Sequence, residues 1–163
     1  MTLTLRDATE ADIPHILRLV RGLAEYERES SACVATEADL RRLMFGPIRR
    51  AHATLAEIAG RPIGLALFSY TVSTFAGRTG LFLEDLFVEQ AHRGSGAGKA
   101  LLRHLAARAV AENCNIIEWR VLNWNQPAIG FYEHLGARPV RDWHIRQLGG
   151  AALKALAEGA SNG

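Results

Sequence analysis

The sequence has few cysteines, no large excess of charge of one sign and no long hydrophobic run. Its two cysteines, Cys33 and Cys114, lie far apart and form no Cys-x-x-Cys pair, which argues against a disulfide framework or a zinc site. A count of 19 basic and 17 acidic residues leaves a net charge of +2, too balanced to indicate nucleic-acid binding. No apolar run reaches the roughly 18 residues that span a bilayer. We therefore expect no metal, no nucleic-acid partner, no membrane partner and a cytoplasmic location.

The length and composition are those of one globular domain. A chain of 163 residues with 48% hydrophobic and 22% charged residues can bury a sizeable core. No internal repeat and no linker divides it, so we predict a single domain over residues 1–158. Small and polar residues gather at the end, and we predict a flexible tail over residues 159–163.

The order of the predicted elements indicates a mixed α/β fold. A short strand over residues 3–6 precedes a helix that Thr9 caps, with Asp12 three residues on in a capping-box position. Thr36 caps a second helix, which stops at Gly46-Pro47. Hairpin-like connections favour antiparallel pairing of the next three strands, over residues 51–59, 63–72 and 81–88. The remaining predicted elements are a helix up to residue 111, a strand over 116–122, a helix over 125–135, a strand pair within 138–148 and a short closing helix.

A glycine-rich segment, Arg93-Gly94-Ser95-Gly96-Ala97-Gly98, separates the strand that ends at Val88 from the helix that follows. Unpaired N–H groups at a helix N-terminus carry positive partial charge and bind anions. Glycines let a diphosphate approach the backbone, and Arg93 and Lys99 add positive charge. The segment therefore predicts a site for a ligand that carries phosphates.

Several kinds of glycine-rich loop have to be distinguished. A P-loop needs Gly-x-x-x-x-Gly-Lys-Ser/Thr, but Arg93 stands in place of the first glycine and Ala100 in place of the hydroxyl that binds magnesium. A dinucleotide fingerprint needs Gly-x-Gly-x-x-Gly on the first βα turn, whereas here Gly-x-Gly-x-Gly follows antiparallel strands. The third pattern, Arg-x-x-Gly-x-Gly after a strand, is present. A glycine-rich turn without a ligand is the remaining alternative.

The Arg-x-x-Gly-x-Gly loop, the element order and residues 123–137 together resemble the GNAT N-acetyltransferase superfamily over nearly the whole chain. Residues 23–27, 83–88 and 124–127 resemble its spermidine/spermine (diamine) acetyltransferase branch. Phe75 stands where the polyamine enzymes carry a tryptophan, and some members of the branch prefer thialysine or other small amines. The resemblance implies a mostly antiparallel, twisted sheet of six to seven strands flanked by helices, with a splayed parallel pair at the cofactor site. It also implies a homodimer.

The resemblance further implies that acetyl-CoA is the cofactor and a small-molecule amine the substrate. Backbone groups of Leu86, Phe87 and Val88 would hold the pantetheine arm and the acetyl group. The loop would hold the pyrophosphate through Arg93, Gly94, Ser95, Gly96, Ala97, Gly98 and Lys99. Residues Asn125, Gln126, Pro127 and Ala128 would contact the cofactor farther along, together with Tyr132. The amine would be bound by Tyr26, Glu27, Glu84 and Asp85.

Acetyl transfer to an amine requires two proton movements. An alkylamine with a pKa of roughly 10.4 arrives protonated, and we predict that Glu84 takes its proton, directly or through water. Tyr132 matches the family's proton donor to the leaving thiolate, with a core tyrosine beside Phe131 as the alternative. A backbone N–H at Val88 or a neighbour would polarise the thioester carbonyl.

On a regular strand Glu84 and Asp85 face opposite sides, so only one of them would point into a given cleft.

Two further hypotheses remain open at this point. The chain would be a catalytically silent acyl-CoA-binding regulatory protein if the reactive residues were not used, but the presence of both Glu84 and Tyr132 favours an enzyme. Alternatively, the acceptor would be another amine, such as an aminoglycoside or a peptide N-terminus.

The acidic cluster of Glu25, Glu27 and Glu29 has two interpretations. It would attract a cation, or it is an exposed acidic helix end.

Overall fold

The computed structural model describes residues 2–159. By its internal contacts the chain forms two compact units, the first ending at Leu122 and the second beginning at Asn123. The single domain predicted over residues 1–158 stays a prediction. Except for Gly159, the predicted tail lies outside the described residues. No helix within residues 2–159 has both the length and the apolar character needed to cross a membrane.

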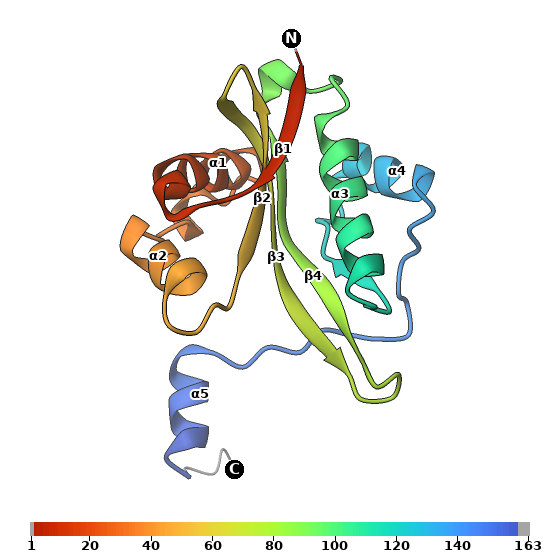
Figure 1. The fold of residues 1–163 in the computed structure, drawn as a ribbon. Coiled ribbons are helices and arrows are strands. Elements are labelled where there is room, and N and C mark those ends of the chain that lie inside the picture. Colours follow the sequence, from red (N-terminus) through yellow and green to blue (C-terminus); the bar gives the residue numbers. More distant parts are fainter. Residues whose placement is uncertain (1, 160–163) are drawn as a thin grey trace. The chain divides into compact units, whose positions relative to one another are not determined.

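One mixed sheet forms the centre of the first unit (Figure 1). Its strands lie in the order β1-β2-β3-β4-β5. Their bounds are β1 Leu3–Asp7, β2 His52–Ile58, β3 Arg61–Ser73, β4 Arg78–Val88 and β5 Ile117–Trp119. Strands β1 to β4 pair antiparallel, and β5 pairs parallel with β4. The predicted mixed fold with one parallel pair is therefore confirmed, although the described residues form five strands and not six or seven.

Helices cover both faces of this sheet. The helices α1 (Ile13–Tyr26) and α2 (Glu37–Phe45) lie on one face, and α3 (Ala97–Ala111) lies on the other (Figure 1). Short 3-10 turns are η1 (Glu10–Asp12), η2 (Ser30–Ala32) and η3 (Gln90–His92). The backbone N–H of Thr9 donates to the Asp12 carboxylate at 2.7 Å, and the Thr36 hydroxyl accepts from the N–H of Asp39 at 3.2 Å. The cap predicted at Thr36 is confirmed, whereas Thr9 caps the turn η1 and α1 begins after it with Asp12 as its N-cap.

The main hydrophobic core lies between the sheet and the α1–α2 pair. Ile16 and Leu19 of α1, Leu55 of β2 and Leu65 of β3 are each 0% exposed. Apolar residues three or four apart on a helix share one face, and alternate residues on a strand share one face. Each such side chain contributes about 1.5–3 kcal/mol when fully buried. This core therefore fixes α1 over β3 and β4, where the candidate site lies.

An ion-paired cluster joins the start of the chain to the sheet. Arg6 on β1 donates to the two carboxylate oxygens of Asp12 at 2.7 and 2.8 Å and to Glu57 of β2 at 2.7 Å. The hydrogen bonds from Arg6 hold the pKa of Asp12 well below its usual range. Because Asp12 also bonds to the cap residue Thr9, the cluster positions the entry of α1 relative to β1 and β2.

The second unit contains two helices, α4 (Gln126–His134) and α5 (Gly150–Ala157). The closing helix is thus confirmed, but the strand pair predicted within residues 138–148 is wrong, because those residues form no strand. Val140 and Ile145 are exposed and Trp143 is 79% exposed, so no apolar face is buried to support a ladder. An isolated strand pair of this kind is marginal in water, and Pro139 lacks an N–H group to donate.

Candidate active site

The parallel pair separates halfway along β4. The ladder joins β4 to β5 only from Leu81 opposite Ile117 to Leu83 opposite Trp119, whereas β4 runs on to Val88. In the described residues, the backbone of residues 84–88 therefore has β3 on one side and no strand on the other. Such an edge presents N–H and C=O groups to a ligand. Leu86, Phe87 and Val88, which are predicted to hold the pantetheine arm and the acetyl group, all lie on it.

A β-bulge at the start of this edge turns two acidic side chains to the same face. The β3–β4 register shifts between Leu67 and Phe68, which leaves Glu84 as the extra residue of β4. Asp85 lies opposite Leu67, whose side chain belongs to the core beneath α1. The Ser69 hydroxyl, on the same face as Leu67, donates to Glu84 at 3.0 Å. The prediction that Glu84 and Asp85 face opposite sides is wrong, because a bulge interrupts the alternation of side chains along a strand.

Three carboxylates act on one another at this place. Burial, followed by the charges of Glu84 and Glu27, raises the pKa of Asp85 to about 6. Burial and the charge of Glu29 also raise the pKa of Glu27, which directly follows the last residue of α1. Neighbouring negative charges disfavour further ionisation and attract cations. The first unit therefore brings together Glu27, Glu84 and Asp85; their predicted role in binding an amine stays a prediction.

The predicted amine-binding residue Tyr26 lies against a residue of the cofactor loop. Cζ of Arg93 is 4.3 Å from the centroid of the Tyr26 ring and 5.9 Å from that of Phe87. Nε of Arg93 also donates to the carbonyl of Val88 at 3.3 Å. The sequence motif predicted the charge of Arg93 but gave no sign of this stacking, because Tyr26 and Arg93 are brought together only by the packing of α1 on β4.

The glycine-rich loop leads from η3 into α3. Gly94 and Gly96 have φ angles of 79° and 85°, a region that side chains other than glycine enter at a cost. Gly96 is the N-cap of α3 and offers no capping side chain. Within the described ranges, the N–H groups of Gly98 and Lys99 have no acceptor. Free donors and a bare backbone at a helix N-terminus fit a diphosphate.

The remaining predicted residues belong to the second unit. Asn125 caps α4, because its Oδ1 accepts from the N–H of Ala128 at 3.3 Å, and Pro127 stands in the first turn of the helix, where its missing N–H is tolerated. Tyr132 lies toward the end of α4, with its ring centroid 5.4 Å from that of Phe131. The roles of Asn125, Gln126, Pro127, Ala128 and Tyr132 stay predictions.

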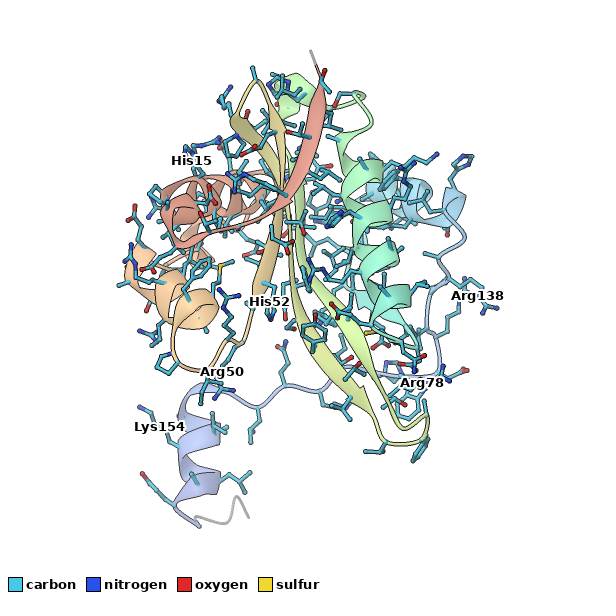
Figure 2. The ribbon with its side chains drawn as sticks, viewed as in Figure 1. His15, Arg50, His52, Arg78, Arg138 and Lys154 are labelled. Atoms are coloured by element: carbon cyan, nitrogen blue, oxygen red, sulfur yellow. The ribbon has the colours of Figure 1, made fainter. Side chains whose placement is uncertain are left out.

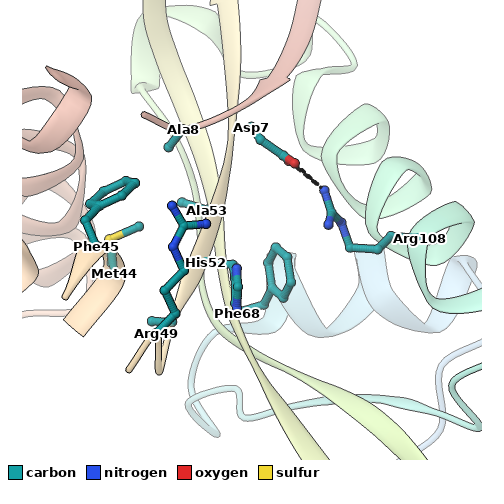
Figure 3. Close-up of a pocket in the computed structure, with 10 residues that line it drawn as sticks. Asp7, Ala8, Met44, Phe45, Arg49, His52, Ala53, Phe68 and Arg108 are labelled. Atoms are coloured by element: carbon teal, nitrogen blue, oxygen red, sulfur yellow. Dashed lines mark hydrogen bonds and ion pairs between the residues drawn. The ribbon is translucent and has the colours of Figure 1, made fainter. Parts of the chain in front are cut away.

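A separate hollow of about 310 Å³, open to solvent, lies where β1 ends (Figure 3). Met44, Phe45 and Phe68 supply apolar walls, and Arg49 and His52 supply polar ones. Across it, Arg108 donates to the two carboxylate oxygens of Asp7 at 2.6 and 2.7 Å. No predicted site residue lines this hollow, so we place the candidate site on the bulged edge of β4.

The histidines give no indication of a metal centre. His15 lies on α1 and His52 on β2 (Figure 2). Among residues 2–159, no group of three or more His, Cys, Asp or Glu residues is arranged to hold a metal ion. The candidate site therefore consists of carboxylates, backbone groups and a glycine-rich loop.

A splayed parallel pair, a loop suited to a diphosphate and an acidic face within the first unit are the features expected of an acyltransferase. The Acetyltransferase (GNAT) family model matches residues 20–137, and the chain belongs to this family. The chain is similar to the thialysine N-epsilon-acetyltransferase of Bos taurus, with 35% identity over 164 residues that cover 94% of this chain and 96% of that protein.

Two further comparisons agree with this. The human spermidine/spermine N(1)-acetyltransferase-like protein 1 is 33% identical over 151 residues, which cover 86% of this chain and 22% of that protein. An integron cassette protein from the V. cholerae mobile metagenome matches with a TM-score of 0.82 and 24% identity over 97% of this chain and 99% of that one, and this likeness shows the fold alone. The predicted family and enzyme class are confirmed: the protein is an N-acetyltransferase of the GNAT family.

Proposed function

We propose that the protein moves an acetyl group from acetyl-CoA to a primary amine of a small polycation, either a diamine or polyamine or a thialysine-like molecule. The single observation that carries this proposal is the bulge that turns Glu84 and Asp85 to one face, next to Glu27. Such a face attracts a molecule with more than one positive charge. The names of the thialysine and spermidine/spermine relatives support the same class of amine.

The residues present fit acetyl-CoA, the acetyl donor typical of the family. Gly94 to Lys99 would hold the pyrophosphate, since this loop has free N–H groups and a bare backbone. The free edge formed by Leu86, Phe87 and Val88 would hold the pantetheine arm, and the first turn of α4 would contact the cofactor farther along. When bound, the cofactor supplies a thioester carbon that an amine can attack.

The reaction we propose is a direct transfer in a ternary complex. Glu84, held by the Ser69 hydroxyl, takes a proton from the ammonium group, directly or through water. The neutral nitrogen then forms the new C–N bond with the acetyl carbon while the C–S bond breaks. Tyr132 donates its phenolic proton to the departing sulfur. The attacking nitrogen loses its second proton as the amide forms, and this proton returns through water to the Tyr132 phenolate, so that the products are an amide and a free thiol. A backbone N–H at Val88 or a neighbour polarises the carbonyl.

Release of free thiol from acetyl-CoA tests this proposal against a panel of amines. We expect turnover with spermidine, spermine or thialysine, and much weaker turnover with aminoglycosides and with a peptide that offers only its N-terminus. A preference for aminoglycosides or peptides would overturn the amine class but keep the enzyme class. Tight acetyl-CoA binding without turnover of any amine would support the silent regulatory protein instead.

The role of Glu84 is tested by Glu84→Gln. The amide keeps the size of the side chain but cannot accept the ammonium proton, and general-base catalysis contributes typically about 10²–10⁴-fold. We expect kcat to fall within that range while the acetyl-CoA Kd stays unchanged. Glu37→Gln, at an exposed position in the first turn of α2, is the matched control. Full activity of Glu84→Gln would exclude Glu84 as the proton acceptor.

We further propose that the protein is a cytoplasmic homodimer without a nucleic-acid partner. The resemblance to the diamine acetyltransferase branch supports the dimer. The free cysteines Cys33 and Cys114 support the cytoplasmic compartment. The balanced charge supports the lack of a nucleic-acid partner. Light scattering after gel filtration should give twice the mass of one chain.

A further inference from the structure

The two cations of the glycine-rich loop have different surroundings. The Arg93 guanidinium lies 4.3 Å from the Tyr26 ring centroid and 5.9 Å from that of Phe87, and its Nε donates to the carbonyl of Val88. Lys99, in the first turn of α3, is exposed. Within residues 2–159, no ring contact or ion pair involves Lys99. One cation of the loop is therefore directed at aromatic rings, whereas the other is available to an anion.

We propose that Arg93 is a positioning residue for the amine: by stacking on Tyr26 it fixes the end of α1 and so links the cofactor loop to the amine-binding face. This inference rests on the proposed function and assigns a role within the same site. A planar guanidinium can stack on an aromatic face and at the same time donate a hydrogen bond from its edge. Arg93 does both, and this defines its orientation more closely than either contact alone.

The contacts continue from Arg93 to a carboxylate of the amine site. Gly22 lets α1 approach β4 closely, because a Cβ added there would lie 2.9 Å from the ring of Phe87. Phe87 is thereby held beneath α1, and Tyr26 ends the same helix. The N–H of Glu27 donates to the carbonyl of Leu23 at 2.9 Å, so Glu27 is attached rigidly to the last turn. A shift of the last turn of α1 would therefore move Tyr26 and Glu27 together.

The electrostatic surroundings are consistent with this role. In the described part of the chain, Arg93 forms no ion pair with a carboxylate, although Glu27 and Asp85 belong to the same region of the first unit. Its partners are two rings and a carbonyl, none of which neutralises its charge. The carboxylates Glu27, Glu84 and Asp85 consequently stay available to a cationic amine. An arginine that paired with one of them would compete with the amine for it.

The test compares Arg93→Met with Lys99→Met. Methionine keeps much of each side chain's length and removes its charge. For Arg93→Met, whose side chain is exposed, we expect the amine KM at saturating acetyl-CoA to rise roughly two- to fivefold, as the loss of a cation–π contact at an exposed site implies. This rise comes in addition to any weakening of the acetyl-CoA Kd that the loss of a positive charge from the loop causes. For Lys99→Met we expect the converse, a weaker acetyl-CoA Kd with an unchanged amine KM. Thermal melts show that each variant is folded.

A double variant separates positioning from a general structural effect. In a Tyr26→Leu background, Arg93→Met should change the amine KM by less than about twofold, because the contact it removes is already lost. Arg93→Lys keeps a cation over the ring and should restore part of the amine KM. If Tyr26→Leu and Arg93→Met each raise the amine KM by a factor that is the same with or without the other change, the proposed role is wrong.

Two other outcomes also decide the question. If Arg93→Met weakens acetyl-CoA binding as much as Lys99→Met does and leaves the amine KM unchanged, Arg93 is a pyrophosphate ligand and the positioning role is wrong. If the parent protein acetylates no amine, the proposed function fails and this role fails with it. An active parent whose amine KM does not respond to Arg93→Met rejects the positioning role alone.

Discussion

At the scale of single residues, the site depends on where two neighbouring carboxylates point. Glu84 is exposed and hydrogen-bonded to Ser69, whereas Asp85 is half-buried and lies opposite Leu67. The two environments give them different tasks. An exposed carboxylate can exchange protons readily with water, and a buried one holds a cation more strongly because the local dielectric is low. These environments favour the roles proposed above, with Glu84 as the proton acceptor and Asp85 as a residue that binds the amine.

The first prediction concerns Asp85 and pH. Burial and the nearby Glu84 and Glu27 raise its pKa from 3.8 to about 6, so the folded chain binds a proton more tightly than the unfolded chain between those pH values. Stability therefore falls as pH rises through this window and then levels off. Asp85→Asn removes this loss. Urea titrations should show the variant about 1–3 kcal/mol more stable than the parent at pH 7.5 and little different at pH 4.

A matched change tests whether burial is the cause. Glu84→Gln removes one of the two charges that raise the pKa of Asp85. Because burial is the larger cause, this variant should be stabilised at pH 7.5 by less than Asp85→Asn is, and should change little at pH 4. If Asp85→Asn alters stability equally at pH 4 and pH 7.5, the proton uptake assigned to Asp85 does not occur.

The second prediction concerns Tyr132. Tyr132→Phe removes only the phenolic hydroxyl, and loss of a general acid lowers rates by about 10²–10⁴-fold. We expect that fall in kcat with an unchanged acetyl-CoA Kd, measured by thiol release and by calorimetry. Tyr70→Phe is the control, because the Tyr70 hydroxyl donates to Glu112 at 2.6 Å and takes no part in the proposed chemistry. Full turnover by Tyr132→Phe would remove Tyr132 from the mechanism.

The third prediction concerns Ser69, which no motif indicated. The hydrogen bond from the Ser69 hydroxyl orients the Glu84 carboxylate. Ser69→Ala should therefore lower kcat by about two- to tenfold, the worth of one such hydrogen bond, and leave the acetyl-CoA Kd unchanged. Thr71→Val, two residues farther along the same strand, is the control. An unchanged kcat would mean that Ser69 does not orient the base.

At the scale of elements, local signals predicted more than long-range pairing did. The starts of the helices were predictable because Thr9 and Thr36 bond to residues three positions away. The bulge at Glu84 was not, since it depends on the register between β3 and β4. The strand pair expected within residues 138–148 failed for a related reason: the apolar residues there have the pattern of strands but remain exposed, and a strand forms only against a partner.

The fourth prediction concerns the loop that precedes α3. Gly96 has a φ of 85°, with open space around a Cβ added to it, so Gly96→Ala strains the backbone without causing a clash. The strain should cost about 1–2 kcal/mol. If the backbone at residue 96 changes its φ angle to avoid this strain, the N–H groups of the loop turn away from the pyrophosphate. We expect the acetyl-CoA Kd, measured by calorimetry, to rise at least tenfold.

The control for this change lies in the β2–β3 turn. Gly60 has a φ of 74° and equally open surroundings, so Gly60→Ala should cost similar stability and leave the acetyl-CoA Kd unchanged. Equal effects of the two variants on the Kd would show that Gly96 acts only through stability.

At the scale of the whole molecule, the order of elements was enough to indicate the mixed sheet, because short connections restrict which strands can be neighbours. The separation of β5 from β4 beyond Leu83 was implied only by the resemblance to a known family, since no residue pattern in β4 itself marks where the ladder stops. The sheet nevertheless brings the free edge, the acidic face and the end of α1 together within the first unit. A ligand that binds there should therefore stabilise the folded chain as a whole.

The last prediction uses that linkage to distinguish the three kinds of phosphate-binding loop. A ligand at 100 times its Kd stabilises the folded state by about 2.7 kcal/mol, and for a chain of this size each kcal/mol raises Tm by roughly 2–4 °C. Acetyl-CoA should therefore raise Tm by about 5–10 °C, whereas ATP with Mg²⁺ and NAD⁺ should shift it far less. Gly96→Ala should reduce the acetyl-CoA shift at the same ligand concentration. An equal shift with ATP and Mg²⁺ would contradict the coenzyme A loop, because the missing hydroxyl at Ala100 would then not matter.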